Sequence, residues 1–124
     1  MNSHKRVLLV DDFEDSRTGL KKLLEIEGYE VIEAADGAQA IECALSSKPD
    51  IILMDLSLPG IDGFSATKRI KEDAAMNSVP IIALSAHDVE YIERFVETAG
   101  WVDYVTKPVD IEALLDRLAK YLPD

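Results

Sequence analysis

The chain is predicted to fold as an α/β domain in which helices cover both faces of a parallel sheet. Strand-like and helix-like segments alternate five times along the sequence. The most apolar strand candidates are short continuous runs, and two of these runs end in aspartate. Short apolar runs separated by helical patterns are typical of the central strands of a parallel sheet.

Five segments are predicted as strands because each is short and rich in apolar or β-branched residues. They are Arg6–Val10, Glu30–Glu33, Asp50–Met54, Val79–Leu84 and Trp101–Val105. The second is short and flanked by acids, so we place it at an edge of the sheet. The first and third are the most apolar and are predicted to be central neighbours.

The intervening segments carry the spacing of amphipathic helices. Gly28 and Gly100 are expected to end the first and fourth helices, and Gly37 to open the second. Right-handed crossovers predict a doubly wound (βα)5 three-layer sandwich, and the edge and central positions given above predict the strand order 2-1-3-4-5. The residues expected to face inward are, helix by helix, Leu20, Leu23 and Leu24; Ala40, Ile41 and Ala44; Ala66, Thr67 and Ile70; Ile92, Phe95, Val96 and Ala99; and Ile111, Leu114, Leu115 and Leu118.

Composition and charge exclude several classes of protein. With 124 residues, 48% of them hydrophobic and 30% charged, the chain is predicted to be one globular domain covering residues 1–124. The net charge of −11 argues against direct nucleic-acid binding, because such affinity depends on neutralising phosphates. The apolar runs are too short for a membrane span and no leader opens the chain, so we expect a cytoplasmic protein with no membrane partner. The single cysteine, Cys43, fits a reducing compartment and a packing role.

Carboxylates follow two of the predicted central strands. Asp11 and Asp12 come directly after the first strand, and Asp55 closes the third apolar run. Ligands of such sheets bind beyond the carboxyl ends of the strands, so the three acids are expected to meet at one edge. Their repulsion is costly unless a cation is bound, and Mg²⁺ accepts one or two carboxylates together with water and phosphoryl oxygens. The alternative for the Asp11–Asp12 pair is that one of them caps the first helix.

Two further strand ends supply a hydroxyl group and a positive charge. Ser85 ends the fourth strand and Lys107 follows the fifth. A buried carboxylate such as Asp55 can attack phosphorus as a nucleophile, and the lysine supplies the complementary charge. The peptide bond before Pro108 could take the cis form and so direct the Lys107 side chain. Taken alone, Ser85 would be interpreted as a helix cap.

The whole set resembles the receiver domain of two-component response regulators. The resemblance is carried by Asp11-Asp12, by Asp55 within the segment Met54–Gly63, by Ser85-Ala86 and by Lys107-Pro108, and it covers essentially the whole chain. It implies a flavodoxin-like fold in which Asp55 accepts a phosphoryl group from a phosphohistidine of a sensor histidine kinase or a histidine phosphotransfer protein. It also implies Mg²⁺ as cofactor, with Mn²⁺ as an alternative ion. The protein would remove its own phosphoryl group and would not otherwise be an enzyme.

The resemblance assigns the metal ligands residue by residue. Asp12 and Asp55 would bind Mg²⁺ through their side chains, Asp11 through a water molecule, and Ser57 through its backbone carbonyl. Ser57 and His87 also lie where the family tunes the lifetime of the phosphoryl group. His87 either meets the attacking water, which would make dephosphorylation pH-dependent near neutrality, or is an exposed loop residue.

The resemblance also implies a switch. Lys107, Ser85 and the backbone of Ala86 would hold the phosphoryl group, and Ser85 and Tyr104 would then change the face formed by the fourth helix, fifth strand and fifth helix. That face would bind an output protein that the sequence does not identify, or a second copy in a phosphorylation-dependent homodimer. Tyr104 could instead simply cover the fifth strand. Trp101 is either an interface anchor on the same face or a local cover over the sheet edge.

Three other functions agree less well with the sequence than a phosphoacceptor does. An aspartate-based phosphatase would need a second acid at the position of Ser57, and a flavin-binding module would need a phosphate-binding loop at Asp11–Asp12. A degenerate receiver would lack a key position, and none is missing. The chain begins at Met1 and ends at Asp124, soon after the fifth predicted helix. We therefore expect a stand-alone receiver or a receiver cut from a larger protein.

Overall fold

A single parallel sheet forms the centre of the molecule, and its strands run in the order β2-β1-β3-β4-β5. The computed structural model describes residues 5–58, 60–86 and 99–122. Within them the strands are β1 (Arg6–Val10), β2 (Glu30–Ala34), β3 (Ile51–Asp55), β4 (Ile81–Ser85) and β5 (Asp103–Thr106). The predicted doubly wound fold and its strand order are confirmed.

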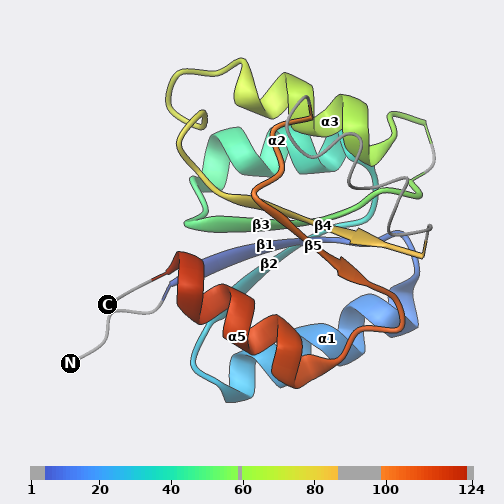
Figure 1. Cartoon of the computed structure of the whole chain (residues 1–124). Helices are drawn as coiled ribbons and strands as arrows, with labels where there is room; N and C mark the ends of the chain where they lie inside the picture. Colours follow the sequence, from blue (N-terminus) through green and yellow to red (C-terminus); the bar gives the residue numbers. More distant parts are fainter. Residues whose placement is uncertain (1–4, 59, 87–98, 123–124) are drawn as a thin grey trace.

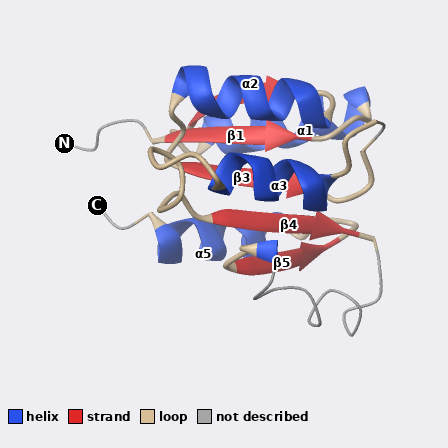
Figure 2. Cartoon of the chain, turned by 90° about the horizontal axis from the view of Figure 1, so that it is seen from above, coloured by secondary structure: helices blue, strands red, loops and turns tan. Residues whose placement is uncertain are grey.

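Helices cover both faces of this sheet. Figure 1 shows α2 and α3 on one face and α1 and α5 on the other. The view in Figure 2 shows the strands side by side, all pointing the same way, so their carboxyl ends lie along one edge. The helices are α1 (Glu14–Ile26), α2 (Gly37–Ser47), α3 (Gly63–Lys71) and α5 (Ile111–Tyr121). The fourth predicted helix lies outside the described residues except for Ala99, which is buried.

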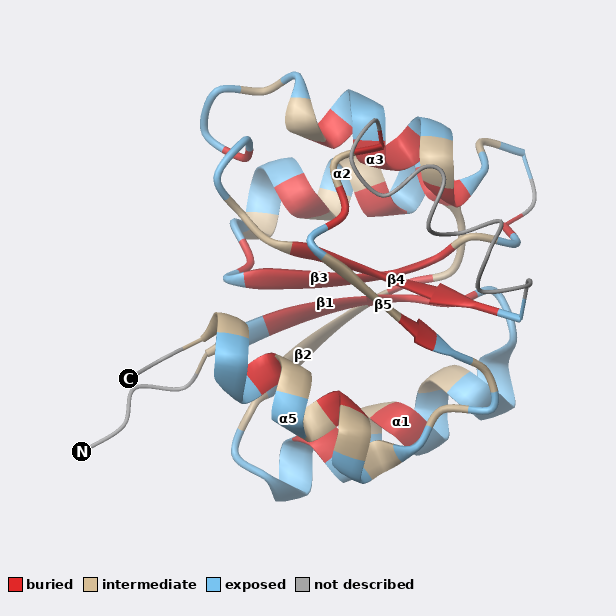
Figure 3. Cartoon of the chain, in the orientation of Figure 1, coloured by how far each residue is buried: buried red, intermediate tan, exposed pale blue. Residues whose placement is uncertain are grey.

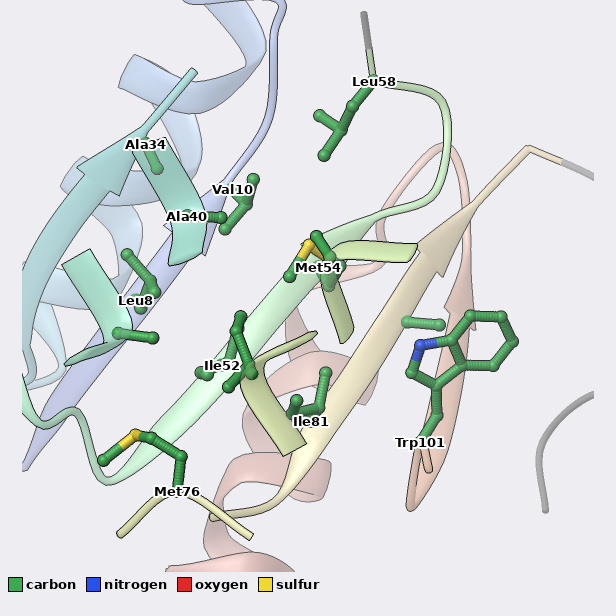
Figure 4. Packing of buried hydrophobic residues seen from close by; sticks show 14 of the residues in the cluster. Leu8, Val10, Ala34, Ala40, Ile52, Met54, Leu58, Met76, Ile81 and Trp101 are labelled. Carbon is green, nitrogen blue, oxygen red and sulfur yellow. The ribbon is translucent and has the colours of Figure 1, made fainter. Parts of the chain in front are cut away.

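The core consists of two hydrophobic layers separated by the sheet. Consecutive side chains of a strand point to opposite faces, so Leu8 and Val10 belong to the layer under α2 and α3, and Val7 and Leu9 to the layer over α1 and α5. Every residue of β3 and β4 is buried, as Figure 3 shows by colour. Figure 4 shows part of the first layer, in which Ile52, Met54 and Ile81 lie between the strands and the helices above them. The carboxyl ends of these strands are therefore held on a rigid, fully packed base.

Aspartates begin three of the helices. The carboxylates of Asp36, Asp62 and Asp110 each accept a hydrogen bond from a backbone amide in the first turn of α2, α3 and α5, at 2.8, 2.7 and 3.0 Å. Such caps satisfy amides that have no partner within the helix. Gly28 follows α1 with φ of 97°, a conformation that favours glycine. The predicted end of the first helix and the predicted start of the second are thus confirmed.

Among the described residues, Leu23 is a predicted core residue that points outward. Leu20 and Leu24 of α1 are buried, but Leu23 is 45% exposed, so its expected inward position is wrong. Residues four apart on a helix lie nearly above one another, and Leu20 and Leu24 define the line of contact with the sheet. Leu23 lies to one side of that line and borders a shallow pocket with Pro108 and Val109.

None of the helices within the described ranges is long and apolar enough to cross a membrane.

Candidate functional site

The predicted site residues meet at the carboxyl edge of the sheet. In the strand register Val10 of β1 lies beside Met54 of β3, so Asp11 and Asp55 follow at the same level. The amide of Asp11 still donates a hydrogen bond to the carbonyl of Ala34, at 3.1 Å, which extends the pairing of β1 with β2. Asp11 and Asp55 therefore lie at the point where the chain crosses from one side of the sheet to the other, where ligands bind in this class of fold.

Asp11, Asp12 and Asp55 form one carboxylate cluster. One oxygen atom from each side chain lies within 4.8 Å of the other two. Asp11 and Asp55 are buried, with 1% and 2% exposed, whereas Asp12 is exposed. Two carboxylates at this separation repel each other by roughly 3 kcal/mol at an effective dielectric constant of about 20. The cluster therefore needs compensating positive charge.

Lys107 supplies part of that charge. Its ammonium nitrogen lies 2.8 Å from Oδ2 of Asp55 and 3.7 Å from Oδ2 of Asp11. The backbone amide of Lys107 donates to the carbonyl of Ser85 at 2.8 Å, which ties the loop after β5 to the end of β4. The peptide bond between Lys107 and Pro108 is cis, as the sequence suggested. The lysine thus reaches both buried acids from the end of β5, across β4.

Asp55 remains an electrostatically costly residue despite these partners. Its Oδ1 accepts a hydrogen bond from the amide of Ser57 at 2.9 Å, and Oδ2 is bonded to Lys107. Burial raises the pKa of the Asp55 carboxyl above its ordinary value, and the nearby Asp11 adds to that rise. The hydrogen bonds and positive charge from Lys107 and Ser57 lower the pKa but do not cancel the effect of burial.

Asp11 is held by groups that the sequence analysis missed. Its Oδ1 accepts from the amide of Phe13 at 2.9 Å and its Oδ2 from the hydroxyl of Ser16 at 2.9 Å. A guanidinium nitrogen of Arg17 donates to the Asp11 carbonyl at 2.7 Å. These contacts depend on how α1 packs against the sheet, so no pattern in the sequence indicated them. Neither acid of the pair caps this helix, whose N-cap residue is Phe13.

The donor set fits a magnesium ion. All three side chains offer carboxylate oxygens, which hard divalent cations prefer, and the exposed Asp12 provides access from solvent. Asp11 already accepts two hydrogen bonds through its carboxylate, which is compatible with contact through a water molecule. The predicted convergence of the three acids is therefore confirmed, and the residues present suit the ion.

Ser85 and Ala86 lie at the same edge of the sheet. Ser85 is buried at the end of β4 and lies beside Thr106 of β5 in the strand register. Ala86 follows it and is exposed. Tyr104 is partly buried and packs against the layer under α2 and α3. His87 lies outside the described residues, so the alternatives for it stay predictions.

Trp101 is a core residue. Only 4% of it is exposed, its indole nitrogen donates to the hydroxyl of Thr67 at 3.0 Å, and its ring meets Phe64 edge to face, with centroids 5.8 Å apart. Figure 4 shows the indole beside β4 and β5. Trp101 is therefore not an exposed interface anchor. The structure agrees with the other prediction, that Trp101 covers the sheet.

Known proteins are similar to this chain in sequence and in fold. The model of the response regulator receiver domain family matches residues 7–119. Protein PilH of Pseudomonas aeruginosa is 38% identical over 110 residues, which cover 89% of this chain and 91% of PilH. The polar-differentiation response regulator DivK of Brucella anthropi is 32% identical over 120 residues, or 97% of this chain and 98% of DivK.

Solved structures of receiver proteins have the same fold as this chain. The chemotaxis protein CheY4 of Vibrio cholerae superposes with a TM-score of 0.91 at 29% identity, covering 97% of this chain and all of that one (100%). The receiver domain of a sensor histidine kinase from Pseudomonas aeruginosa, which has a magnesium ion coordinated in its active-site cleft, gives a TM-score of 0.90 at 35% identity and covers 98% of this chain and 100% of its own. Phosphoryl acceptance is general in the matched family. The chain therefore belongs to the response regulator receiver domains of two-component signalling.

Proposed function

We propose that this protein is a phosphorelay receiver that takes a phosphoryl group onto Asp55 from a phosphohistidine of a sensor kinase or phosphotransfer protein. The observation that carries the proposal is the position of Asp55. It is a buried carboxylate at the end of a central strand, 2.8 Å from the ammonium group of Lys107 and within a cluster of three acids. A structural ion pair alone would not call for two further carboxylates beside it.

In the transfer step a bond forms between an Asp55 carboxylate oxygen and phosphorus. The bond from phosphorus to the histidine nitrogen breaks at the same time, and the imidazole keeps the electron pair and takes up a proton. The step brings one anion onto another, so the protein's task is to position the groups and neutralise charge. The Lys107 ammonium is placed to bind the Asp55 carboxylate before the transfer and the phosphoryl oxygens after it. Ser85 and the backbone of Ala86 offer further hydrogen-bond donors.

Asp12 and Asp55 would hold Mg²⁺ through their side chains, with Asp11 acting through water and Ser57 through its carbonyl. When bound, the ion neutralises charge on the phosphoryl oxygens and fixes their orientation. Mn²⁺ has the same preference for carboxylate and water and would serve in its place.

The same site would release the phosphoryl group. Water attacks phosphorus, the bond to the Asp55 oxygen breaks, and inorganic phosphate leaves the free carboxylate behind. Ser57 is exposed beside the acceptor and His87 follows two residues after Ser85, so both are candidates for setting the rate. Apart from accepting and releasing its own phosphoryl group, the protein would catalyse no reaction.

Phosphorylation would change the shape of one surface of the protein, and a partner would recognise that change. Ser85 would move toward the phosphoryl group, and Tyr104 would repack beside it and shift the face that includes β5 and α5. Such a switch works by stabilising one of two packings through differential contacts. The occupant of that face would be an output protein or a second copy of the chain, in the cytoplasm, with residues 1–124 acting as one domain.

Intact-mass measurement after incubation with acetyl phosphate tests the chemistry. We expect one added phosphoryl group in the presence of Mg²⁺ and none in EDTA. Asp55→Asn should lose the adduct. Asp36→Asn is the matched control, because asparagine can still cap α2 and the residue lies outside the cluster. An adduct that persists in Asp55→Asn, or no adduct from acetyl phosphate or a phosphohistidine donor, would contradict the proposal.

A further inference from the structure

Arg17 connects the metal-binding loop to the edge of the sheet. One guanidinium nitrogen donates to the backbone carbonyl of Asp11 at 2.7 Å, and Nε donates to Oε1 of Glu33 on β2 at 3.1 Å. The side chain of Arg17 is only 16% exposed. An arginine with its planar group held at both ends is more rigid than a single surface ion pair.

The carbonyl that Arg17 binds belongs to the peptide joining Asp11 to Asp12. The side chain of Asp11 is separately fixed by the amide of Phe13 and the hydroxyl of Ser16. The carboxylate of Asp12 is exposed, so its direction depends on how the backbone before it is held. Arg17 is the charged group that holds that peptide.

Electrostatics alone would make Arg17 unfavourable here. A guanidinium close to a cation site repels the cation, and Glu33 offsets this repulsion only in part because it also pairs with Lys21 at 3.3 Å. A benefit from Arg17 must therefore come from geometry. The two effects have opposite signs, so a binding measurement distinguishes them.

We propose that Arg17, supported by Glu33, is a positioning residue that orients the Asp11–Asp12 peptide for divalent cation binding. The inference rests on the proposed function only in taking the acidic cluster as the Mg²⁺ site. Arg17 contacts neither the cation nor the phosphoryl group and acts through the backbone of Asp11.

Isothermal titration of the whole protein with MgCl₂ tests this directly, without phosphorylation. In Arg17→Met the Mg²⁺ affinity should fall by about tenfold, the usual cost of losing a group that orients a metal ligand. Lys21→Met is the matched control. This substitution removes a positive charge from the same helix, and that charge also pairs with Glu33. Among the described residues, the Lys21 ammonium contacts Glu33 and not Asp11. Its Mg²⁺ affinity should stay the same or rise.

Arg17→Lys separates shape from charge. It keeps the positive charge but cannot bind Glu33 and the Asp11 carbonyl with one planar group, so its Mg²⁺ affinity should also fall. The rate of labelling by acetyl phosphate in both Arg17 variants should recover at saturating Mg²⁺, which simple misfolding would not allow. Unchanged or tighter Mg²⁺ binding in Arg17→Met, or an equal loss in Lys21→Met, would overturn the inference. If the unmodified protein binds no Mg²⁺, the metal assignment in the proposed function fails as well.

Discussion

Asp55 combines two properties that oppose each other at the level of a single residue. Its place at the end of a fully buried strand removes it from water, which disfavours the charged form. Its proposed chemistry requires that charged form, because the carboxylate is the nucleophile. Lys107 and the Ser57 amide favour the charge, yet the pKa of Asp55 stays raised. The charged Asp55 side chain is therefore expected to lower the free energy of unfolding, although the proposed chemistry requires it.

Asp55→Asn should increase the free energy of unfolding at pH 7 in EDTA. Since burial raises the pKa of Asp55, the folded protein keeps this proton at pH values where the unfolded chain has released it. Stability is therefore lost as pH rises from the ordinary value of 3.8 through the raised pKa. Urea unfolding at several pH values should show the two proteins alike in acid and the variant more stable above this range. A variant that is less stable at pH 7 would contradict the account.

The sequence identified the acids and the lysine of the site but not the groups that orient them. Asp11, Asp55 and Lys107 could be predicted because each follows an apolar strand, and strand ends meet at one edge. Ser16 and Arg17 could not be found in this way, since they bind Asp11 through contacts set by the angle between α1 and the sheet. Such contacts depend on tertiary packing and leave no periodic signal.

At the scale of elements, the start of α3 packs tightly against the end of β3. A Cβ atom on Gly63 would collide with the carbonyl oxygen of Asp55 and the Cα of Leu56. Both neighbours are backbone atoms and cannot move aside as a flexible side chain would. The close approach therefore links the position of α3 to that of Asp55, the proposed phosphoacceptor.

Gly63→Ala is expected to destabilise the protein by about 1–3 kcal/mol, the typical cost of inserting a methyl group where no space exists. It should also slow phosphorylation, because relief of the clash displaces the Asp55 backbone. Gly19→Ala is the matched control. A Cβ atom there meets nothing within 4 Å, so it should stabilise α1 by about 0.5–1 kcal/mol. Thermal unfolding measures both changes, and equal effects of the two substitutions would show that space at Gly63 is not limiting.

A buried hydrogen-bond chain fixes the segment before β5 to α3. The indole of Trp101 donates to the hydroxyl of Thr67, which donates in turn to the carbonyl of Gly63 at 2.7 Å. The strand was expected to begin at Trp101, but β5 begins at Asp103. Trp101 instead belongs to the segment that this hydrogen-bond chain holds against α3.

Thr67→Val should cost about 1–3 kcal/mol of unfolding free energy, because it leaves the buried indole N–H without its acceptor at nearly constant volume. Thr18→Val on the exposed side of α1 should change stability by no more than about 0.5 kcal/mol. Chemical denaturation compares the two directly. If Thr67→Val matches Thr18→Val, the Trp101 contact contributes nothing to the fold.

The order of the strands was predictable from the sequence, whereas their ends were predicted less well. Apolar content placed β1 and β3 at the centre and β2 at an edge, since burial on both faces requires continuous apolar runs. β3 was expected to begin at Asp50 but begins at Ile51. Asp50 still pairs with Arg6, because its carboxylate accepts from the Arg6 amide at 2.8 Å and its own amide donates to the Arg6 carbonyl at 2.9 Å. A polar residue at a strand boundary can pair through its side chain as well as its backbone, so the folded neighbours decide where the strand begins.

The whole molecule has a net charge of −11, and three of its acids lie together at one edge of the sheet. Binding of a divalent cation by the folded state alone raises stability by mass action. The expected gain is about 2.7 kcal/mol when Mg²⁺ is present at about 100 times its dissociation constant.

MgCl₂ should therefore raise the melting temperature relative to EDTA with NaCl at the same ionic strength. Asp12→Asn should lose most of this increase, because it removes the exposed carboxylate of the cluster. Differential scanning calorimetry gives the shift for each protein. An increase of the same size in Asp12→Asn would mean that Mg²⁺ acts through general screening of the surface charge.

The most direct test of the central claim is to locate the phosphoryl group on the chain. After labelling with acetyl phosphate and Mg²⁺, reduction with borohydride converts a phosphorylated aspartate into homoserine, which peptide mass mapping can assign. The account predicts homoserine at position 55 and unmodified aspartate at positions 11 and 12. Homoserine at either of those two positions, or a phosphoryl group carried on a histidine, would contradict the assignment of Asp55 as the acceptor.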